Sequence, residues 1–212
     1  MTSVRKLYLE VAASVTELIA APEVAAAWDE PSALPKMSVR GLAGHLAGQV
    51  LHLPKVLAEP VPVEETISLD EYYARASWIG SDVDDKSSVA VRNGGEEEAA
   101  KGPVDLASRV DATVRELRTA LLAAPDRPVR RATWGPWSIS LDDFVASRLL
   151  EMVVHCDDLA YSVGVATPEL HGQAVQLVVD VLSRIAVRRH GAVDVLRAFS
   201  RAERAPSTIA AL

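Results

Sequence analysis

The feature that most constrains this chain is the spacing of its apolar residues, which recur every three or four positions over long stretches. Such spacing places apolar side chains on one face of an α-helix, whereas a half-buried strand requires strict alternation. No stretch of the sequence has a clear strand pattern, and no internal repeat is evident. The sequence therefore predicts an all-α protein.

Start and stop signals divide this pattern into helices. Ser38 and Ser140 are good N-caps, Pro54 should kink the second helix, and Gly164 and Gly191 are suited to end the fourth and fifth helices. The expected helices cover about residues 4–27, 39–59, 104–124, 141–163, 168–190 and 194–204.

Residues 60–103 are the least regular part of the sequence. Ser68 and Glu71 form a capping box that predicts one short helix. The acidic, glycine-containing segment 82–103 is expected to be an exposed loop. Four long helices joined by turns indicate a four-helix bundle over residues 1–165, with residues 166–212 as a helical extension packed on it.

The charge and cysteine content exclude several classes of protein. With 29 acidic and 22 Lys and Arg residues, the chain has a formal net charge of −7, which argues against nucleic-acid binding and electrostatic membrane binding. Glu10 and Glu17 interrupt the apolar run that a signal peptide needs, and Cys156 is the single cysteine. We expect a cytoplasmic protein without an intramolecular disulfide.

Charged residues of the predicted fourth helix fall where the core should be. On a helical wheel, Arg148 and His155 lie inside the apolar stripe and Glu151 lies at its edge. Burying such charged groups costs on the order of several kcal/mol unless they are paired with an opposite charge or coordinate a metal. Either Arg148 and Glu151 form a buried ion pair, with His155 satisfied by a carbonyl or by Asp158, or Glu151 and His155 are metal ligands one turn apart.

The second helix supplies further candidates beside its apolar stripe. His45 is a plausible third metal ligand, because helices of a bundle bring such side chains together, and Gln49 and His52 lie near it on the helical wheel. Trp137, in the turn before the fourth helix, could wall a pocket or simply pack over the end of the bundle.

Two segments, SVRGLAGHLAGQ and SRLLEMVVHCDDLAYSVG, resemble the N-terminal domain of mycothiol-dependent maleylpyruvate isomerases. The resemblance implies a DinB-like metal-binding four-helix bundle, here with a short helical C-terminal extension. It also implies a divalent metal, with zinc preferred, held by His45, Glu151 and His155. A low-molecular-weight thiol such as mycothiol would be the second small-molecule partner.

A metal with three protein ligands keeps open positions and can activate a bound thiol or water. The leading hypothesis is an isomerase or S-transferase that acts on a small electrophile. The alternatives are a metal-dependent hydrolase and a non-catalytic helical module with a buried Arg/Glu/His network. Arg148 and Asp158 are the candidate catalytic residues, and Gln49, His52 and Trp137 are the candidate cofactor contacts. Bundles of this kind often pair through helix faces, so a homodimer is compatible with the pattern.

Overall fold

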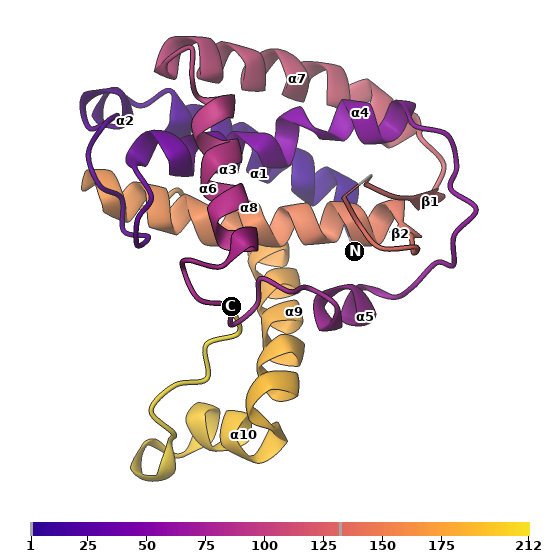
Figure 1. Cartoon of the computed structure of the whole chain (residues 1–212), viewed down its shortest axis with the longest axis vertical. Coiled ribbons are helices and arrows are strands. Elements are labelled where there is room, and N and C mark those ends of the chain that lie inside the picture. The colour runs from indigo at the N-terminus through magenta and orange to yellow at the C-terminus, as the bar shows by residue number, and fades with distance from the viewer. Residues whose placement is uncertain (1, 132) are drawn as a thin grey trace.

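The computed structural model describes residues 2–131 and 133–212, most of which are helical (Figure 1). The helices are α1 Val4–Ile19, α2 Pro22–Ala26, α3 Val39–Leu51, α4 Leu53–Ala58, α5 Leu69–Ala74, α6 Lys86–Glu98, α7 Pro103–Ala123, α8 Leu141–Val163, α9 Gly172–His190 and α10 Ala192–Ser200, followed by a 3₁₀ turn at Ala202–Arg204.

The core of the molecule is a four-helix bundle. Helices α1, α3, α7 and α8 form it: α1 and α3 each pack against both α7 and α8. Fully buried side chains from all four helices meet in the centre, among them Tyr8, Leu42, Leu117 and Leu149. Removing this apolar surface from water drives the assembly. The structure confirms the predicted all-α bundle with a helical C-terminal extension.

The predicted helix signals are present at the two helices that carry the candidate site. The Ser38 hydroxyl accepts a hydrogen bond from the Gly41 amide at the start of α3, and the Ser140 hydroxyl accepts one from the Asp143 amide at the start of α8. Gly164 ends α8 with φ 73°, a left-handed conformation that glycine adopts without strain. The capping box of Ser68 and Glu71 also forms, at the start of α5.

Several helix boundaries differ from the sequence prediction; the expected helix 194–204, for example, is α10 Ala192–Ser200 followed by the 3₁₀ turn. The expected helix 4–27 is divided, because Pro22 begins α2 and the preceding Ala21 is extended, as residues before proline tend to be. Around Pro54 the chain shows the predicted kink: one residue, His52, separates α3 from α4 and itself keeps a right-handed helical conformation. Helix α9 begins at Gly172 rather than near residue 168, and the ring of His171 accepts a hydrogen bond from the Gln173 amide there.

The expected loop 82–103 is the main error of the sequence prediction, because it contains α6. This helix packs closely against α3 through glycines: a Cβ atom on Gly44 would lie 2.0 Å from the Gly95 carbonyl oxygen, and one on Gly95 would lie 2.2 Å from the Gly41 oxygen. An ion pair between Arg40 Nε and Glu96 Oε2, 2.5 Å apart, links the same two helices. Because α6 packs through glycines and polar side chains, its sequence has no apolar stripe, and the spacing of apolar residues does not predict the helix.

A short β-ribbon joins α7 to α8. Its strands, β1 (Pro128–Val129) and β2 (Ile139–Ser140), are antiparallel, with Val129 opposite Ile139. Two residues per strand are too few for a recognisable alternation, so the sequence did not predict them. The ribbon leads directly into the N-cap of α8 and holds the turn that carries the tryptophans.

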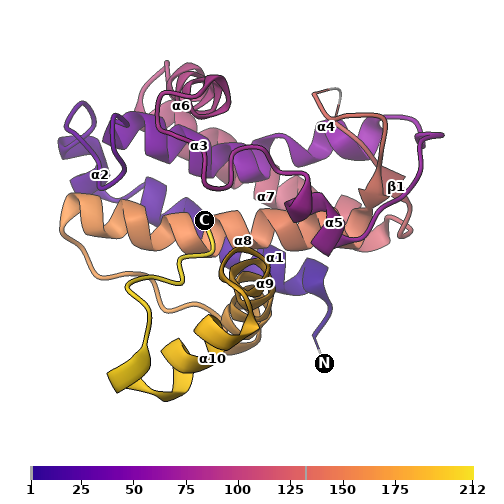
Figure 2. The ribbon, with the colours of Figure 1, turned by 60° about the horizontal axis from the view of Figure 1, so that its bottom comes forward.

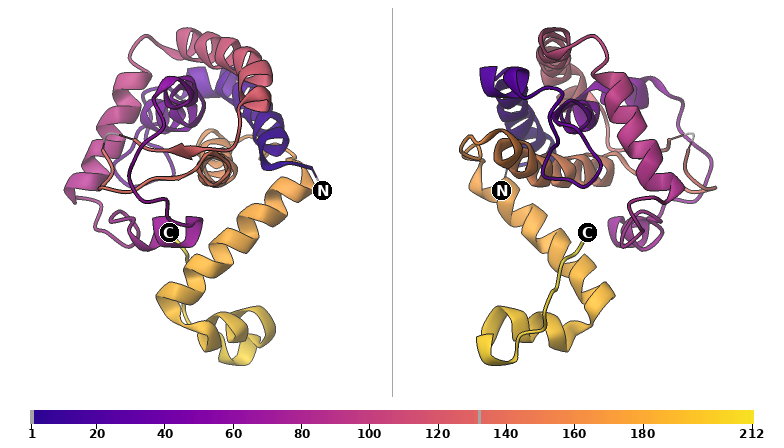
Figure 3. Two further views of the ribbon diagram at one scale, coloured as in Figure 1. Left: turned by 90° about the vertical axis from the view of Figure 1, so that its right-hand side faces the viewer. Right: turned by 60° about the vertical axis from the view of Figure 1, so that its left-hand side comes forward.

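Helix α9 leaves the bundle at an angle, crossing α8, and α10 lies at its far end (Figures 2 and 3). The bundle-facing side of α9 buries Ala174, Val178, Val181 and Ile185. Within residues 2–131 and 133–212, no helix combines the length and the apolar character needed to cross a bilayer.

Candidate metal centre

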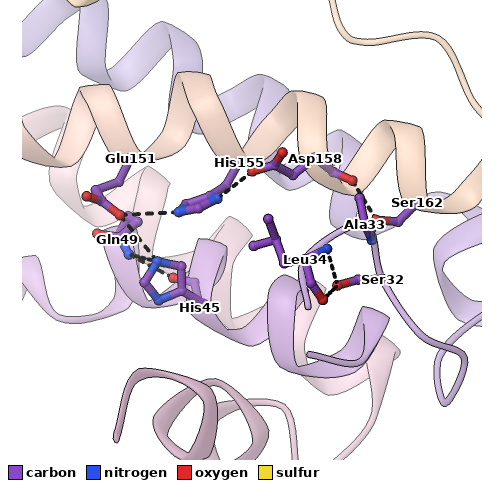
Figure 4. Close-up of polar contacts among 9 residues, drawn as sticks. All are labelled: Ser32, Ala33, Leu34, His45, Gln49, Glu151, His155, Asp158 and Ser162. Carbon is purple, nitrogen blue, oxygen red and sulfur yellow. Dashed lines mark hydrogen bonds and ion pairs between the residues drawn. The ribbon is translucent and has the colours of Figure 1, made fainter. Parts of the chain in front are cut away.

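Two neighbouring bundle helices bring three potential metal ligands together (Figure 4). His45 projects from α3, and Glu151 and His155 project from one face of α8, one helical turn apart. Glu151 Oε2 lies 3.3 Å from His45 Nε2 and 3.4 Å from His155 Nε2. One ligating atom from each residue falls within 4.8 Å of the others.

The cluster is mostly shielded from solvent. Glu151 is 8% exposed, and the side chains of His45 and His155 are 18% and 16% exposed. The two imidazole rings meet edge to face, with 4.8 Å between their centroids. Both histidine side chains therefore keep some contact with solvent, whereas Glu151 between them is almost fully buried.

The charges of the three side chains depend on one another. Burial lowers the pKa of His45. Burial also opposes the charge of His155, but hydrogen bonds to Asp158 and Glu151 outweigh it and raise the pKa of His155 to about 9. Burial alone would raise the pKa of Glu151, yet the hydrogen bonds from His155 and His45 hold it well below its usual range. The two histidines therefore favour the ionised form of Glu151 in the core.

His155 is oriented by a residue one turn further along α8. Its Nδ1 donates a hydrogen bond to Asp158 Oδ2, 2.8 Å away, which directs Nε2 toward Glu151 (Figure 4). Such a contact from the non-ligating nitrogen to a carboxylate is the usual support of a metal-bound histidine. The contact that the sequence suggested for Asp158 is therefore present, and its part in the chemistry is a proposal.

The three residues fit a divalent metal. Metal–ligand distances of about 2.0–2.2 Å in tetrahedral geometry place neighbouring ligand atoms roughly 3.3–3.6 Å apart. The two Nε2–Oε2 separations, 3.3 and 3.4 Å, match that spacing, and the three ligand atoms all lie within 4.8 Å of one another. Two imidazole nitrogens and one carboxylate oxygen are also ligand types that zinc accepts.

Arg148 is not the ion-pair partner of Glu151, contrary to one of the two explanations drawn from the sequence. Its guanidinium donates to Gln49 Oε1 at 2.9 Å and to the Tyr72 hydroxyl at 3.1 Å, and it lies over the Phe144 ring. No salt bridge joins it to Glu151 among the described residues. Burial lowers the pKa of Arg148, but Tyr72 and Glu151 outweigh that effect and raise it.

Gln49 connects Arg148 to the cluster. Its side-chain Nε2 donates to the His45 carbonyl oxygen at 2.9 Å and lies 3.4 Å from His45 Nε2, while its Oε1 receives the Arg148 bond. The structure therefore places Gln49 at the edge of the three-ligand cluster, within its polar network. A contact with a cofactor is a proposal.

His52 and Trp137, the other two candidate cofactor contacts, lie apart from the three ligand atoms. His52 ends α3 and turns toward α6, where its Nε2 lies 3.2 Å from Glu98 Oε2. Trp137 stacks on Trp134 with 4.7 Å between ring centroids and meets the edge of Tyr72 at 5.8 Å. Trp137 thus belongs to an aromatic group on the Tyr72 side of Arg148, and His52 belongs to the α3–α6 contact.

Two tyrosines of α5 were missed by the sequence reasoning. Tyr72 is 7% exposed and binds Arg148, and Tyr73 is 5% exposed beside it. The only signal was the sequence EYYA after a capping box, which predicts a short helix but not where it packs. Cys156, the single cysteine, is fully buried in the core, and burial raises the pKa of its thiol to about 12.

Comparison with known proteins identifies one family. A family model described as "Mycothiol maleylpyruvate isomerase N-terminal domain" matches residues 8–160, which include His45, Glu151 and His155. The match confirms the resemblance seen in the two helix segments and the DinB-like character of the bundle. No curated protein and no solved structure matches the chain.

Proposed function

This chain belongs to the mycothiol maleylpyruvate isomerase N-terminal domain family, and from this premise we propose that it is a metal-dependent enzyme that uses a low-molecular-weight thiol. The reaction would be isomerisation of a small electrophilic molecule or sulfur transfer to it. The observation that carries the proposal is the convergence of two histidine nitrogens and one carboxylate oxygen, from two helices, within 4.8 Å.

His45, Glu151 and His155 would hold the metal, for which we propose zinc. A divalent metal with three protein ligands keeps open positions and lowers the pKa of a thiol or water bound there. Asp158 holds the His155 ring through Nδ1, so that Nε2 keeps its direction without a rearrangement. Both helices that carry the ligands belong to the packed core of the bundle, which restrains the backbone of the ligands.

Arg148 would bind a carboxylate of the substrate or of the thiol. Its guanidinium is held in place by Gln49 and Tyr72, so little side-chain entropy remains to be lost on binding an anion. Arg131 adds a second guanidinium nearby: burial and the positive charge of Arg148 both lower the pKa of Arg131. Two neighbouring positive charges of this kind favour an anionic ligand.

The proposed reaction balances without a further co-reactant. The thiol loses its proton to solvent, and its sulfur adds to an electrophilic carbon of the substrate to form a carbon–sulfur bond. If that bond breaks again after rotation about the adjacent carbon–carbon bond, the thiol is released and an isomer results. If it persists and the substrate takes up a proton, the product is an S-conjugate.

A non-catalytic role is the competing interpretation, and one observation favours it. The three side chains already hydrogen-bond one another and Asp158, so the cluster can be satisfied as a buried polar network without a ligand. A metal-dependent hydrolase, in which water replaces the thiol, would use the same ligands.

One assay separates these functions. Zinc-loaded protein is incubated with maleylpyruvate in the presence and absence of mycothiol, beside Glu151→Gln, which keeps the side-chain size but removes the charge. We expect turnover only with thiol, lost in Glu151→Gln and unchanged in Glu97→Gln, an exposed α6 control. Turnover that proceeds equally without thiol would indicate hydrolysis. No turnover and no metal binding would favour the polar network.

A further inference from the structure

The hydroxyl of Tyr73 is a buried polar group without a partner. Tyr73 is 5% exposed. Among the buried side-chain nitrogen and oxygen atoms of the described residues, its hydroxyl oxygen is the one that lacks a hydrogen bond. Buried polar groups are normally hydrogen-bonded, so an unpaired one requires an explanation. Tyr72 next to it, in contrast, has its hydroxyl bonded to Arg148.

Tyr73 belongs to a helix that packs against α8, the helix that carries Glu151. Its ring lines a groove of about 610 Å³ between α5 and α9, but its oxygen is directed into the protein, away from solvent. Helix α5 packs against α8, and the Tyr72 hydroxyl is 3.1 Å from Arg148, one turn before Glu151. Burial is the main reason that the pKa of Tyr73 is raised well above its usual value, and the negative charge of Glu151 is the next.

Glu151 has an oxygen atom available for such a donor. Its Oε2 atom faces both histidines, whereas Oε1 has no hydrogen bond among the described side chains. Carboxylates that ligate metals are usually hydrogen-bonded by a residue outside the ligand set, which fixes their orientation. Asp158 serves His155 in this way, and the carboxylate has no equivalent partner in the hydrogen bonds of the described residues.

We propose that the Tyr73 hydroxyl donates a hydrogen bond to the Glu151 carboxylate when that carboxylate holds the metal. Tyr73 would then be a positioning residue that acts through Glu151. This inference rests on the proposed metal-dependent function and deepens it, because it assigns to α5 the support of the carboxylate ligand.

The test compares Tyr73→Phe with Tyr72→Phe, each of which removes one hydroxyl and keeps the ring. Zinc affinity is measured by competition with a chelator, and the visible absorption of the cobalt-loaded proteins reports the ligand geometry. Thermal unfolding of the metal-free proteins shows whether either hydroxyl supports the fold itself.

For Tyr73→Phe we expect zinc affinity to fall about 10- to 100-fold and the cobalt bands to shift, as for other partners of metal ligands. Its metal-free melting temperature should be unchanged or higher, because no hydrogen bond is lost. Tyr72→Phe should show the opposite pattern, with a lower melting temperature, because Arg148 loses an acceptor, and a zinc affinity close to that of the parent chain.

Zinc affinity and cobalt spectra of Tyr73→Phe that equal those of the parent chain would overturn the inference, and so would a metal-free Tyr73→Phe that unfolds. If the parent chain itself binds no zinc, the proposed function fails and the inference with it. That outcome is distinct from a parent chain that binds zinc and a variant that binds it equally well.

Discussion

A carboxylate in the core of a bundle requires charged or polar neighbours, and Glu151 shows how single residues provide them. Its charge is balanced by His45 and His155, while Arg148 of the same helix is turned away toward Gln49 and Tyr72. Because Arg148 is bound elsewhere, the histidines are left as the direct partners of Glu151. That separation leaves the histidine nitrogens and the carboxylate oxygen free to act as one set of ligands.

At the scale of single residues, the Asp158→Asn substitution tests whether the contact with Asp158 supports His155 as a metal ligand. The amide oxygen can still accept the bond from Nδ1, but the negative charge that strengthens it is lost. We expect zinc affinity to fall about 10-fold, at the lower end of the usual effect of such partners. Chelator competition measures the change.

Asp157→Asn is the matched control, since Asp157 lies on the same turn but accepts a surface hydrogen bond from Thr167 Oγ1. Its zinc affinity should equal that of the parent chain. Equal zinc affinities of the Asp158→Asn and Asp157→Asn variants would show that the contact with His155 does not support a metal ligand.

At the scale of helices, the way an element packs decides whether its sequence reveals it. Helices α1, α3, α7 and α8 bury stripes of large apolar side chains, so spacing and capping residues predicted them. Helix α6 packs through glycines and ion pairs instead. Its sequence is therefore polar and acidic, which is typical of a loop. Sequence periodicity detects side-chain stripes, and it does not detect contacts between backbones.

The α3–α6 contact gives a paired prediction on neighbouring glycines of α6. In Gly95→Ala the new methyl group would meet the Gly41 carbonyl oxygen at 2.2 Å, so the two helices must move apart. We expect a loss of about 1–3 kcal/mol in the free energy of unfolding, as for other overpacked positions. Urea denaturation measures it.

Gly94→Ala is the control, because a Cβ atom there has nothing within 4 Å. Replacing this exposed helical glycine should stabilise the protein by up to about 1 kcal/mol. Effects of the same sign and size at both positions would contradict the close helix contact.

The candidate site could be predicted only where its residues lie on helices that have a stripe of apolar side chains. His45, Glu151 and His155 were found because polar residues interrupt or border an apolar stripe on α3 and α8. Tyr72 and Tyr73 come from a six-residue helix in an irregular segment, where spacing gives no information about packing. The partner of Arg148 was predicted wrongly, because a wheel shows which face a residue is on but not which neighbour reaches it.

At the scale of the whole molecule, the C-terminal helices lie outside the family match, which ends at residue 160. We propose that residues 1–165 form the metal-binding bundle and that residues 166–212 are an extension docked on it. The docking face of α9 is narrow and apolar, while Val179 and the far side of the helix are exposed.

A substitution in this face should release the extension without disturbing the bundle. Val178 is 1% exposed, so Val178→Asp places an unpaired carboxylate in an apolar contact. This should cost on the order of several kcal/mol of docking free energy. We expect faster amide hydrogen exchange in α9 and α10, with protection of α1, α3, α7 and α8 and zinc binding retained. Val179→Asp, at a position that is 45% exposed, should leave exchange unchanged. Loss of protection throughout the bundle in Val178→Asp would show that the two parts fold as one unit.

The most direct test of the metal centre is the metal content of the purified, untagged protein beside its His45→Ala variant, measured by elemental analysis after zinc has been supplied and excess removed. We expect about one equivalent of zinc in the parent chain and none in the variant, because α3 contributes His45 as a ligand beside the two ligands from α8. A parent chain without metal, or a His45→Ala variant that retains a full equivalent, would contradict the proposed metal centre.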